Sequence, residues 1–381
     1  MPSDLKKQMK FPGTIILLLL IVACDCTVFA QGIYVTDDGV KFRVEVVAKN
    51  LAIPWSIAFA QGDLFFTERP GTLRVLKKGG GVPRLLARLN DVRAVGEGGL
   101  MGLAFHPLFN SNRFLYLSYT YSVGGNIFNK VVRYTLSNDS LTGSLVINDR
   151  LPGSGVHNGC RIRFGPDRKL YVTTGDAAQR DIAQDMSSMG GKILRLNDDG
   201  SIPSDNPFKG SPIYSLGHRN GQGIDWHPTL GLLFESEHGP SGFDGPGGGD
   251  EINIVEARKN YGWPVIHHQQ TAQGMVSPFL EFTPAIAPSG ASFYSGSQFP
   301  GFVNNLFVAT LRGSHILRVV LKKDDPYSVA SSERLLEGRY KRIRDIVEGP
   351  DGFLYFCTSN RDGRATPSSD DDRILRIVPV E

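Results

Sequence analysis

The sequence has little net charge and no long run of charge of either sign. Its 41 lysines and arginines oppose 38 aspartates and glutamates, which leaves a formal net charge of +3 over 381 residues. Proteins that hold nucleic acid or a membrane surface electrostatically carry a concentrated basic patch, so we expect no nucleic-acid partner. A long amphipathic helical pattern is also missing, which argues against a helical fold.

Cysteine is scarce. The chain has four, and Cys24 and Cys26 lie within its first thirty residues, which leaves Cys160 and Cys357 for the rest. Two cysteines do not make a disulfide framework. The repeat described below puts them in units that are not neighbours, so we expect two free, buried thiols.

The first thirty residues are typical of an export signal. Lys6, Lys7 and Lys10 precede an apolar stretch, residues 14–24, that is rich in Ile and Leu. This stretch is short for a membrane span but suits the apolar core of a signal peptide.

Two processing sites are compatible with this segment. Residues 21–24 resemble a lipobox, with Cys24 as the candidate for lipid attachment, and residues 28–30 resemble an ordinary signal-peptidase site. The third alternative is an uncleaved N-terminal anchor. All three predict an extracytoplasmic protein that is secreted, periplasmic or lipid-anchored on the outer side of the membrane, with a leader at 1–30 and one domain at 31–381.

Glycine and proline are abundant, at 44 and 23 residues, as a fold of many short strands and tight turns requires. One unit recurs along the chain: an apolar or alternating strand, a turn with Gly or Pro, an aromatic or β-branched second strand, and a third strand. In the first copy these strands are residues 55–59, 62–67 and 71–76. The first strands of the later copies are residues 99–105, 160–164, 221–226, 290–294 and 344–347.

The period of this repeat predicts the fold. Starts lie about 45 to 65 residues apart, which is the size of a propeller blade. The strand at residues 41–47 precedes the first unit, and we expect it to be the outer strand of the sixth blade, because this closes the ring and removes an exposed edge. The predicted fold is all-β, a six-bladed β-propeller with four-stranded antiparallel blades. A β-sandwich or two barrels would not explain a sixfold period.

Polar residues gather where insertions interrupt the repeat. His157 lies just before the first strand of the third unit, and Asp176 just after its second strand. Antiparallel neighbours bring these positions to the same end of the blade. Asp176 could then accept from one imidazole nitrogen and leave the other as a general base. The alternative is that each residue is satisfied in its own turn.

Two further turns carry candidate ligands. Arg219, in a Gly-His-Arg-Asn turn, offers a fork of donors to a carboxylate, although an ordinary ion pair is the alternative. Residues 237–240, Glu-His-Gly-Pro, begin a glycine-rich loop that ends at Asp250 and Glu251. Backbone carbonyls and carboxylates suit Ca²⁺, while the other interpretation is a merely flexible loop. Zinc is disfavoured, because no Cys/His cluster has ligand spacing.

Nine motifs together resemble the soluble quinoprotein glucose/sorbosone dehydrogenase family, also described as aldose sugar dehydrogenases. They occur in family order and span nearly the whole mature chain. They are residues 96–107, 157–161, 174–176, 190–195, 217–220, 237–240, 250–253, 260–264 and 342–345.

The resemblance implies a dehydrogenase that oxidises aldoses at the anomeric carbon to lactones. It implies pyrroloquinoline quinone (PQQ) held over Ca²⁺ on the top face of the propeller, and an external electron acceptor. Carried over, His157 is the base that takes the proton of the anomeric hydroxyl as hydride passes to the quinone. Asp176 orients His157, and Arg219 stabilises negative charge that develops on a quinone oxygen.

The resemblance also assigns cofactor contacts. It places Asn220 beside the cofactor, and Arg342 and Arg344 match two arginines that meet its carboxylates. Glu97 stands where the glucose dehydrogenases carry a glutamine, and Arg312 approximately where they carry a cofactor-binding lysine. A negative Glu97 would weaken binding of an anionic cofactor unless Arg312 or Arg219 compensates it.

For the metal, the resemblance implies that Gly239 and Pro240 give backbone carbonyls to the Ca²⁺ that polarises the quinone. A second, structural Ca²⁺ is implied near Glu251 and Tyr261. The loops between units look shorter than in dimeric glucose dehydrogenases, so we expect a monomer with an open site and broad aldose specificity.

Two other functions compete with this one. The first is a non-catalytic propeller of the same ancestry that binds a glycan or protein on its top face. The joint presence of His157, Asp176, Arg219 and the 239–240 turn favours the enzyme. The second is a propeller hydrolase or lactonase, which would need a central metal held by several carboxylates and amides, and the loops supply too few.

Overall fold

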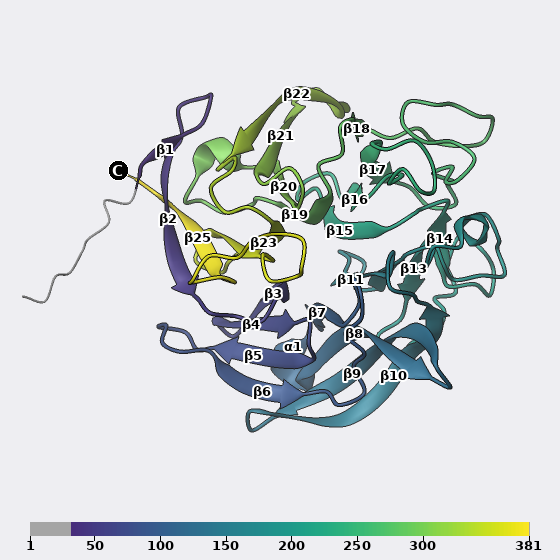
Figure 1. Ribbon diagram of the computed structural model, residues 1–381, viewed down its shortest axis with the longest axis horizontal. Helices are drawn as coiled ribbons and strands as arrows, with labels where there is room; N and C mark the ends of the chain where they lie inside the picture. The colour runs from purple at the N-terminus through teal and green to yellow at the C-terminus, as the bar shows by residue number, and fades with distance from the viewer. Residues whose placement is uncertain (1–31, 381) are drawn as a thin grey trace, which may run out of the picture. The chain divides into compact units, whose positions relative to one another are not determined.

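The computed structural model describes residues 32–380, which form six antiparallel sheets arranged as blades around a central axis (Figure 1). The six-bladed β-propeller predicted from the repeat is therefore confirmed. The predicted leader at 1–30, with Cys24, lies outside the described residues.

Blades 1 to 5 each take four consecutive strands, innermost strand first. Blade 1 is β3 (Pro54–Ala60), β4 (Asp63–Glu68), β5 (Thr72–Leu76) and β6 (Arg84–Arg88). Blade 2 is β7 (Leu100–Phe105), β8 (Phe114–Val123), β9 (Asn126–Ser137) and β10 (Ser140–Pro152). Blade 3 is β11 (Gly159–Phe164), β12 (Leu170–Thr174), β13 (Lys192–Leu196) and β14 (Ile213–Leu216). Blade 4 is β15 (Gly221–Trp226), β16 (Leu233–Glu237), β17 (Asp250–Val255) and β18 (Leu280–Phe282). Blade 5 is β19 (Pro288–Phe293), β20 (Leu306–Thr310), β21 (Ile316–Lys322) and β22 (Asp325–Leu335).

Blade 6 joins the two ends of the described chain. Its inner strands are β23 (Ile343–Glu348), β24 (Leu354–Thr358) and β25 (Ile374–Pro379), and its outer strands are β2 (Lys41–Ala48) and β1 (Tyr34–Val35). Strand β2 pairs with β25 in the register Val44 to Ile377, so the N-terminal strand closes the ring as the sequence predicted. The short β1 makes this sheet five-stranded.

Apolar side chains between neighbouring blades hold the ring together. The innermost strands touch in the order β3, β7, β11, β15, β19 and β23, and β23 returns to β3 (Figure 1). A separate buried cluster fills each of the six seams; that between blades 3 and 4, for example, contains Ile193 and Ile224. Each blade thus buries its faces only against its neighbours, as in other repeat folds.

Every innermost strand has a register shift near its start, in its pairing with the second strand of the same blade. These irregularities lie between Pro54/Ser56, Leu100/Leu103, Gly159/Ile162, Gly221/Gly223, Pro288/Ala291 and Ile343/Asp345. A β-bulge bends its strand and changes the direction of nearby side chains. In all six blades the innermost strand is therefore irregular at the end of the ring where it begins.

Helical structure within residues 32–380 is limited to α1 (Phe109–Asn112) and two 3₁₀ turns, η1 (Arg180–Ala183) and η2 (Pro300–Phe302). None of the helices described is long and apolar enough to cross a membrane. Cys160 on β11 and Cys357 on β24 are free and buried in blades that are not neighbours, which confirms the expectation for the two thiols.

Candidate active site

A cavity of about 660 Å³ lies at the end of the ring where the innermost strands begin. Loops from several blades meet there. Some of them lead into the first strand of a blade, and others connect two later strands of the same blade. Seven of the residues singled out in the sequence line this cavity: Glu97, His157, Arg219, Gly239, Pro240, Arg312 and Arg342. Segments far apart in the sequence therefore share one wall.

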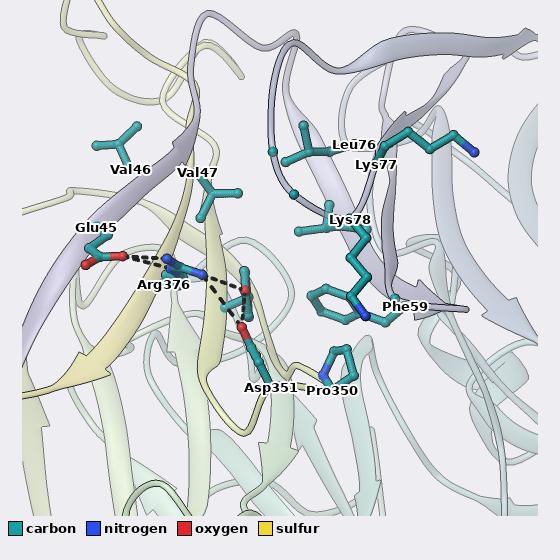
Figure 2. A pocket seen from close by; sticks show the side chains of 15 residues that line it. Glu45, Val46, Val47, Phe59, Leu76, Lys77, Lys78, Pro350, Asp351 and Arg376 are labelled. Atoms are coloured by element: carbon teal, nitrogen blue, oxygen red, sulfur yellow. Dashed lines mark hydrogen bonds and ion pairs between the residues drawn. The ribbon is translucent and has the colours of Figure 1, made fainter.

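A second cavity, of about 710 Å³, lies in the outer seam between blades 6 and 1 (Figure 2). Figure 2 shows Arg376 between Glu45 and Asp351, and its Nη2 is 2.7 Å from a Glu45 oxygen. Its guanidinium is thus already neutralised. None of the residues predicted to act in catalysis or binding lines this cavity, so the first one is the candidate active site.

His157 and Asp176 form the hydrogen bond that strand pairing predicted. The His157 Nδ1 lies 2.7 Å from Asp176 Oδ1, and Trp263 donates its Nε1–H to Asp176 Oδ2 at 2.8 Å. Asp176 is fully buried, and His157 is 4% exposed and lines the cavity. Since an ionised carboxylate only accepts, Nδ1 carries the proton and Nε2 is left as the basic nitrogen.

Arg219 is held by a residue that sequence reasoning did not single out. Its Nε donates to Asp244 Oδ2 at 2.8 Å, and its other nitrogens donate to Ser241 Oγ at 2.9 Å and to the His238 carbonyl at 3.0 Å. Its guanidinium carbon also lies 5.4 Å from the Trp263 ring centroid. The arginine is buried, so these contacts fix its guanidinium at the cavity wall, with the Asp244 carboxylate as its counter-ion.

The charge of Glu97 is balanced by Arg364, rather than by Arg312 or Arg219. Arg364 Nη1 lies 2.8 Å from Glu97 Oε1, and the other Glu97 oxygen accepts from the His157 backbone N–H at 3.1 Å. Burial raises the pKa of Glu97, but the charge of Arg364 and the hydrogen bonds from Arg364 and the His157 N–H outweigh it and lower the pKa to about 2. Glu97 therefore stays ionised, and the pair with Arg364 cancels most of its charge.

Below the main cavity, Arg344 lines a smaller one together with Trp55 and Gln222. Its Nη1 donates to Gln222 Oε1 at 3.1 Å, while its Nε has no hydrogen-bond partner among residues 32–380. Burial lowers the pKa of Arg344 to about 10, so it remains a cation at neutral pH. Arg342, by contrast, is paired with Asp362 at 2.8 Å.

Two other buried nitrogens near the smaller cavity have no hydrogen-bond partner in the described part of the chain: Asn220 Nδ2, a donor, and His238 Nε2. Asn220 accepts the Gly159 N–H at 3.1 Å through its Oδ1, which leaves its amide nitrogen free. Burial lowers the pKa of His238 to about 3 despite the nearby Glu97, so this imidazole is neutral. Unpaired buried polar groups cost stability unless a ligand completes them.

The loop proposed for Ca²⁺ is fixed by Asp250. This carboxylate accepts the Gly239 N–H at 2.9 Å and the Ala287 N–H at 2.6 Å. Gly239 and Pro240 both line the cavity, and their carbonyls accept no backbone hydrogen bond from the residues that the structure describes. Among the described residues, no backbone N–H therefore competes for either oxygen.

Glu251 and Tyr261 lie away from the cavity, beside a buried cluster of His218, Glu235 and Glu237. His218 Nδ1 is 2.9 Å from an oxygen of each of these two glutamates. Burial lowers the pKa of His218, but the two carboxylates outweigh it and raise the pKa to about 10. Glu251 faces Glu237 across the β16–β17 pair, and Tyr261 stacks on the His218 ring at 4.9 Å. His218 is thus buried between two carboxylates.

The chain is similar to known proteins in both sequence and structure. The family model described as glucose/sorbosone dehydrogenase matches residues 51–374. The PQQ-bound structure of an aldose sugar dehydrogenase from Streptomyces coelicolor is 34% identical, with a TM-score of 0.79, over 89% of this chain and 98% of that one. The aldose sugar dehydrogenase YliI of Escherichia coli is 33% identical over 84% of this chain and 91% of its own. Quinoprotein glucose dehydrogenase B of Acinetobacter calcoaceticus is 29% identical over 85% of this chain and 86% of its own.

Proposed function

Because the chain belongs to the glucose/sorbosone dehydrogenase family, we propose that it oxidises aldose sugars at the anomeric carbon to lactones, with PQQ as the cofactor. The observation that carries this proposal is the buried His157–Asp176 pair, with its 2.7 Å contact and its remaining imidazole nitrogen on a cavity wall rich in arginine. A propeller alone implies no function, whereas this pair has the form of a general base with its orienting carboxylate.

The cavity suits an anionic cofactor. Arginine side chains line it from four loops, at positions 219, 312, 342 and 364, and those at 219, 342 and 364 are each paired with a carboxylate, of Asp244, Asp362 and Glu97. Within residues 32–380 neither Arg312 nor the buried Arg344 beneath has such a partner, so these two supply the uncompensated positive charge. Arg344 Nε and Asn220 Nδ2 are buried donors that have no hydrogen-bond partner within residues 32–380, so acceptor atoms of a bound cofactor would satisfy them. PQQ is a planar tricarboxylate that accepts a hydride when bound, and these residues would hold its carboxylates and quinone oxygens.

Oxygen donors also fit the proposed cations. The carbonyls of Gly239 and Pro240 would hold Ca²⁺ next to the cofactor, with Asp250 keeping their loop in place. A second Ca²⁺ is proposed near Glu251 and Tyr261. Burial and the neighbouring Glu237 raise the pKa of Glu251 well above its ordinary value, and a cation there would restore its charge.

In this proposal each residue of the pair has one task. Asp176 keeps the Nδ1 proton of His157 in place, so that Nε2 can take the proton of the anomeric hydroxyl. The imidazolium that forms lies against the carboxylate, which stabilises its positive charge. Arg219, fixed by Asp244, presents a positive charge where negative charge develops.

The proposal extends to the cellular setting. We propose an exported domain at residues 31–381, monomeric in solution, which passes electrons to an external acceptor. The sequence features that support it are the leader-like first thirty residues and the short loops between units.

Reconstitution tests the proposed activity. Purified protein is incubated with PQQ and Ca²⁺, and reduction of an artificial dye is followed with D-glucose, D-xylose and D-galactose. We expect sugar-dependent reduction and a shifted quinone absorbance. If neither occurs, the chain is not this enzyme, and a non-catalytic module that binds a glycan or protein becomes the better interpretation.

His157→Ala tests the assigned base. We expect turnover to be abolished while the absorbance titration still shows bound PQQ. Loss of cofactor binding instead would mean that His157 supports the fold of the site and is not its base.

A further inference from the structure

Phe243 is exposed where the fold gives no reason for an exposed aromatic ring. Its side chain is 69% exposed, and no other phenylalanine among residues 32–380 is mainly exposed. It belongs to none of the apolar clusters between blades. It does line the candidate active site. An apolar ring in such a position is a common element of a ligand-binding surface.

The ring lies directly beside the proposed base. The Phe243 and His157 ring centroids are 6.0 Å apart, and the ring planes are nearly parallel, at 24°. A ligand that places a hydroxyl at the free Nε2 of His157 therefore comes within reach of the phenyl ring.

The loop that carries Phe243 is held in place by its next residue. Asp244 is buried, and its carboxylate accepts from Arg219 Nε at 2.8 Å and from the Ser241 N–H at 2.8 Å. Its carbonyl accepts from Arg180 at 2.7 Å. The ring is thus carried by an anchored loop, so little conformational entropy of the loop is lost when a ligand binds.

We propose that Phe243 is a specificity-determining residue whose ring stacks on the C–H face of the pyranose ring of the aldose while His157 meets its anomeric hydroxyl. This inference rests on the proposed function. A phenyl ring offers no hydrogen bond, so it recognises the apolar face of a sugar ring and not the configuration of each hydroxyl. The substrate class is therefore pyranose aldoses as a group, with weaker binding of those that place an axial hydroxyl on the stacked face.

Two measurements on Phe243→Ala and Phe243→Tyr test the proposal. The first is the steady-state kinetics of dye reduction with D-glucose, D-xylose and D-galactose. The second is calorimetric titration of the PQQ-loaded protein with 1,5-anhydro-D-glucitol, which has the pyranose ring but no anomeric hydroxyl and so cannot be oxidised. Tyr327→Ala serves as the control, because Tyr327 is an exposed aromatic residue on β22 outside the cavity.

For Phe243→Ala we expect KM for D-glucose and Kd for the anhydro sugar to rise about tenfold, since covering about half of a phenyl ring contributes roughly that factor. kcat and PQQ affinity should change less than threefold, and Phe243→Tyr should restore sugar binding. Unchanged KM and Kd in an active enzyme would overturn the role of Phe243 and leave the proposed function intact. Loss of PQQ binding in Phe243→Ala would also overturn it, because the ring would then support the cofactor. A wild-type protein that reduces no dye and binds no anhydro sugar would refute both proposals.

Discussion

Replacing Asp176 by Asn is the most informative change in the proposed base, because it keeps the shape of the side chain and alters only its hydrogen bonding. In the native structure three donors point at this carboxylate: His157 Nδ1 at 2.7 Å and the Ala178 N–H at 2.8 Å meet Oδ1, and Trp263 Nε1 at 2.8 Å meets Oδ2. An amide has only one oxygen and cannot accept from both sides. One donor must therefore be left facing the amide nitrogen.

Either orientation of the amide harms the site. If its oxygen stays with His157, the Trp263 N–H faces an NH₂ group and loses its acceptor. If the amide turns over, its NH₂ group faces Nδ1, which must then accept, so the imidazole proton moves to Nε2 and the base is lost. In both cases the imidazolium formed during the reaction loses its charged partner.

The size of the effect follows from these contacts. Losing a hydrogen bond to a charged group costs about 1.5–3 kcal/mol, and an unsatisfied buried donor costs about 1–3 kcal/mol. The contact to the imidazolium forms only in the reacting state, so its loss raises the barrier by about 1.5–3 kcal/mol and lowers kcat by about 10–150-fold, and a turned amide that removes the base lowers kcat further. The unsatisfied Trp263 donor is present in both the resting and the reacting state, so it lowers the free energy of unfolding instead of kcat.

The assay measures kcat at saturating sugar, PQQ and Ca²⁺, together with PQQ affinity from absorbance and thermal unfolding. Asp225→Asn is the matched control. Asp225 is also buried and accepts backbone N–H groups, from Phe293 at 2.7 Å and from Trp226 at 2.8 Å, but it lies at the opposite end of β15 from the cavity. We expect the control to lose stability and keep kcat. If Asp176→Asn binds PQQ and retains kcat within tenfold of the wild type, the orienting role of Asp176 is refuted.

Two further predictions concern the charges around the cofactor. Arg364→Ala leaves Glu97 without its ion-pair partner, so PQQ affinity should fall several-fold, a modest effect because Arg364 is half exposed; adding Glu97→Gln should restore it, as absorbance titration of each variant would reveal. Arg344→Met removes a buried cation with an unpaired Nε, so the apo-protein should gain about 1–3 kcal/mol of unfolding free energy in urea while PQQ affinity falls. An apo-protein destabilised by Arg344→Met would contradict this reasoning.

The scaffold could be predicted from the sequence because its strand segments recur at regular intervals along the chain. Alternating or apolar segments that recur at blade-sized intervals leave few other folds, and the predicted strand at residues 41–47 had to pair with the last strand of the chain to close the ring. The contact between His157 and Asp176 was predictable for a related reason. Two positions that flank antiparallel neighbours meet at one end whatever path the loops take.

The partners of these residues could not be predicted in this way. Asp244 and Phe243 lie in a glycine-rich loop whose path no periodicity determines, yet one anchors Arg219 and the other borders His157. Arg364 lies in the loop between β24 and β25 of blade 6, which the repeat did not mark as an insertion. The one usable signal was the polar composition of residues 359–372, which exceeds what a turn between two strands requires.

The repeat and the site are nevertheless connected through the register shifts at the start of all six innermost strands. The cavity lies at the end of the ring where these shifts occur, and a bulge turns nearby side chains out of the regular pleat. At blade 3 the shift between Gly159 and Ile162 follows directly after His157, whose φ of 52° lies in the left-handed region that few residues other than glycine adopt. The hydrogen bonds to Asp176 and Glu97 hold this conformation in place. The same irregularity occurs in the other five blades, where no base is positioned, so the shift is a property of the scaffold that the site at blade 3 shares.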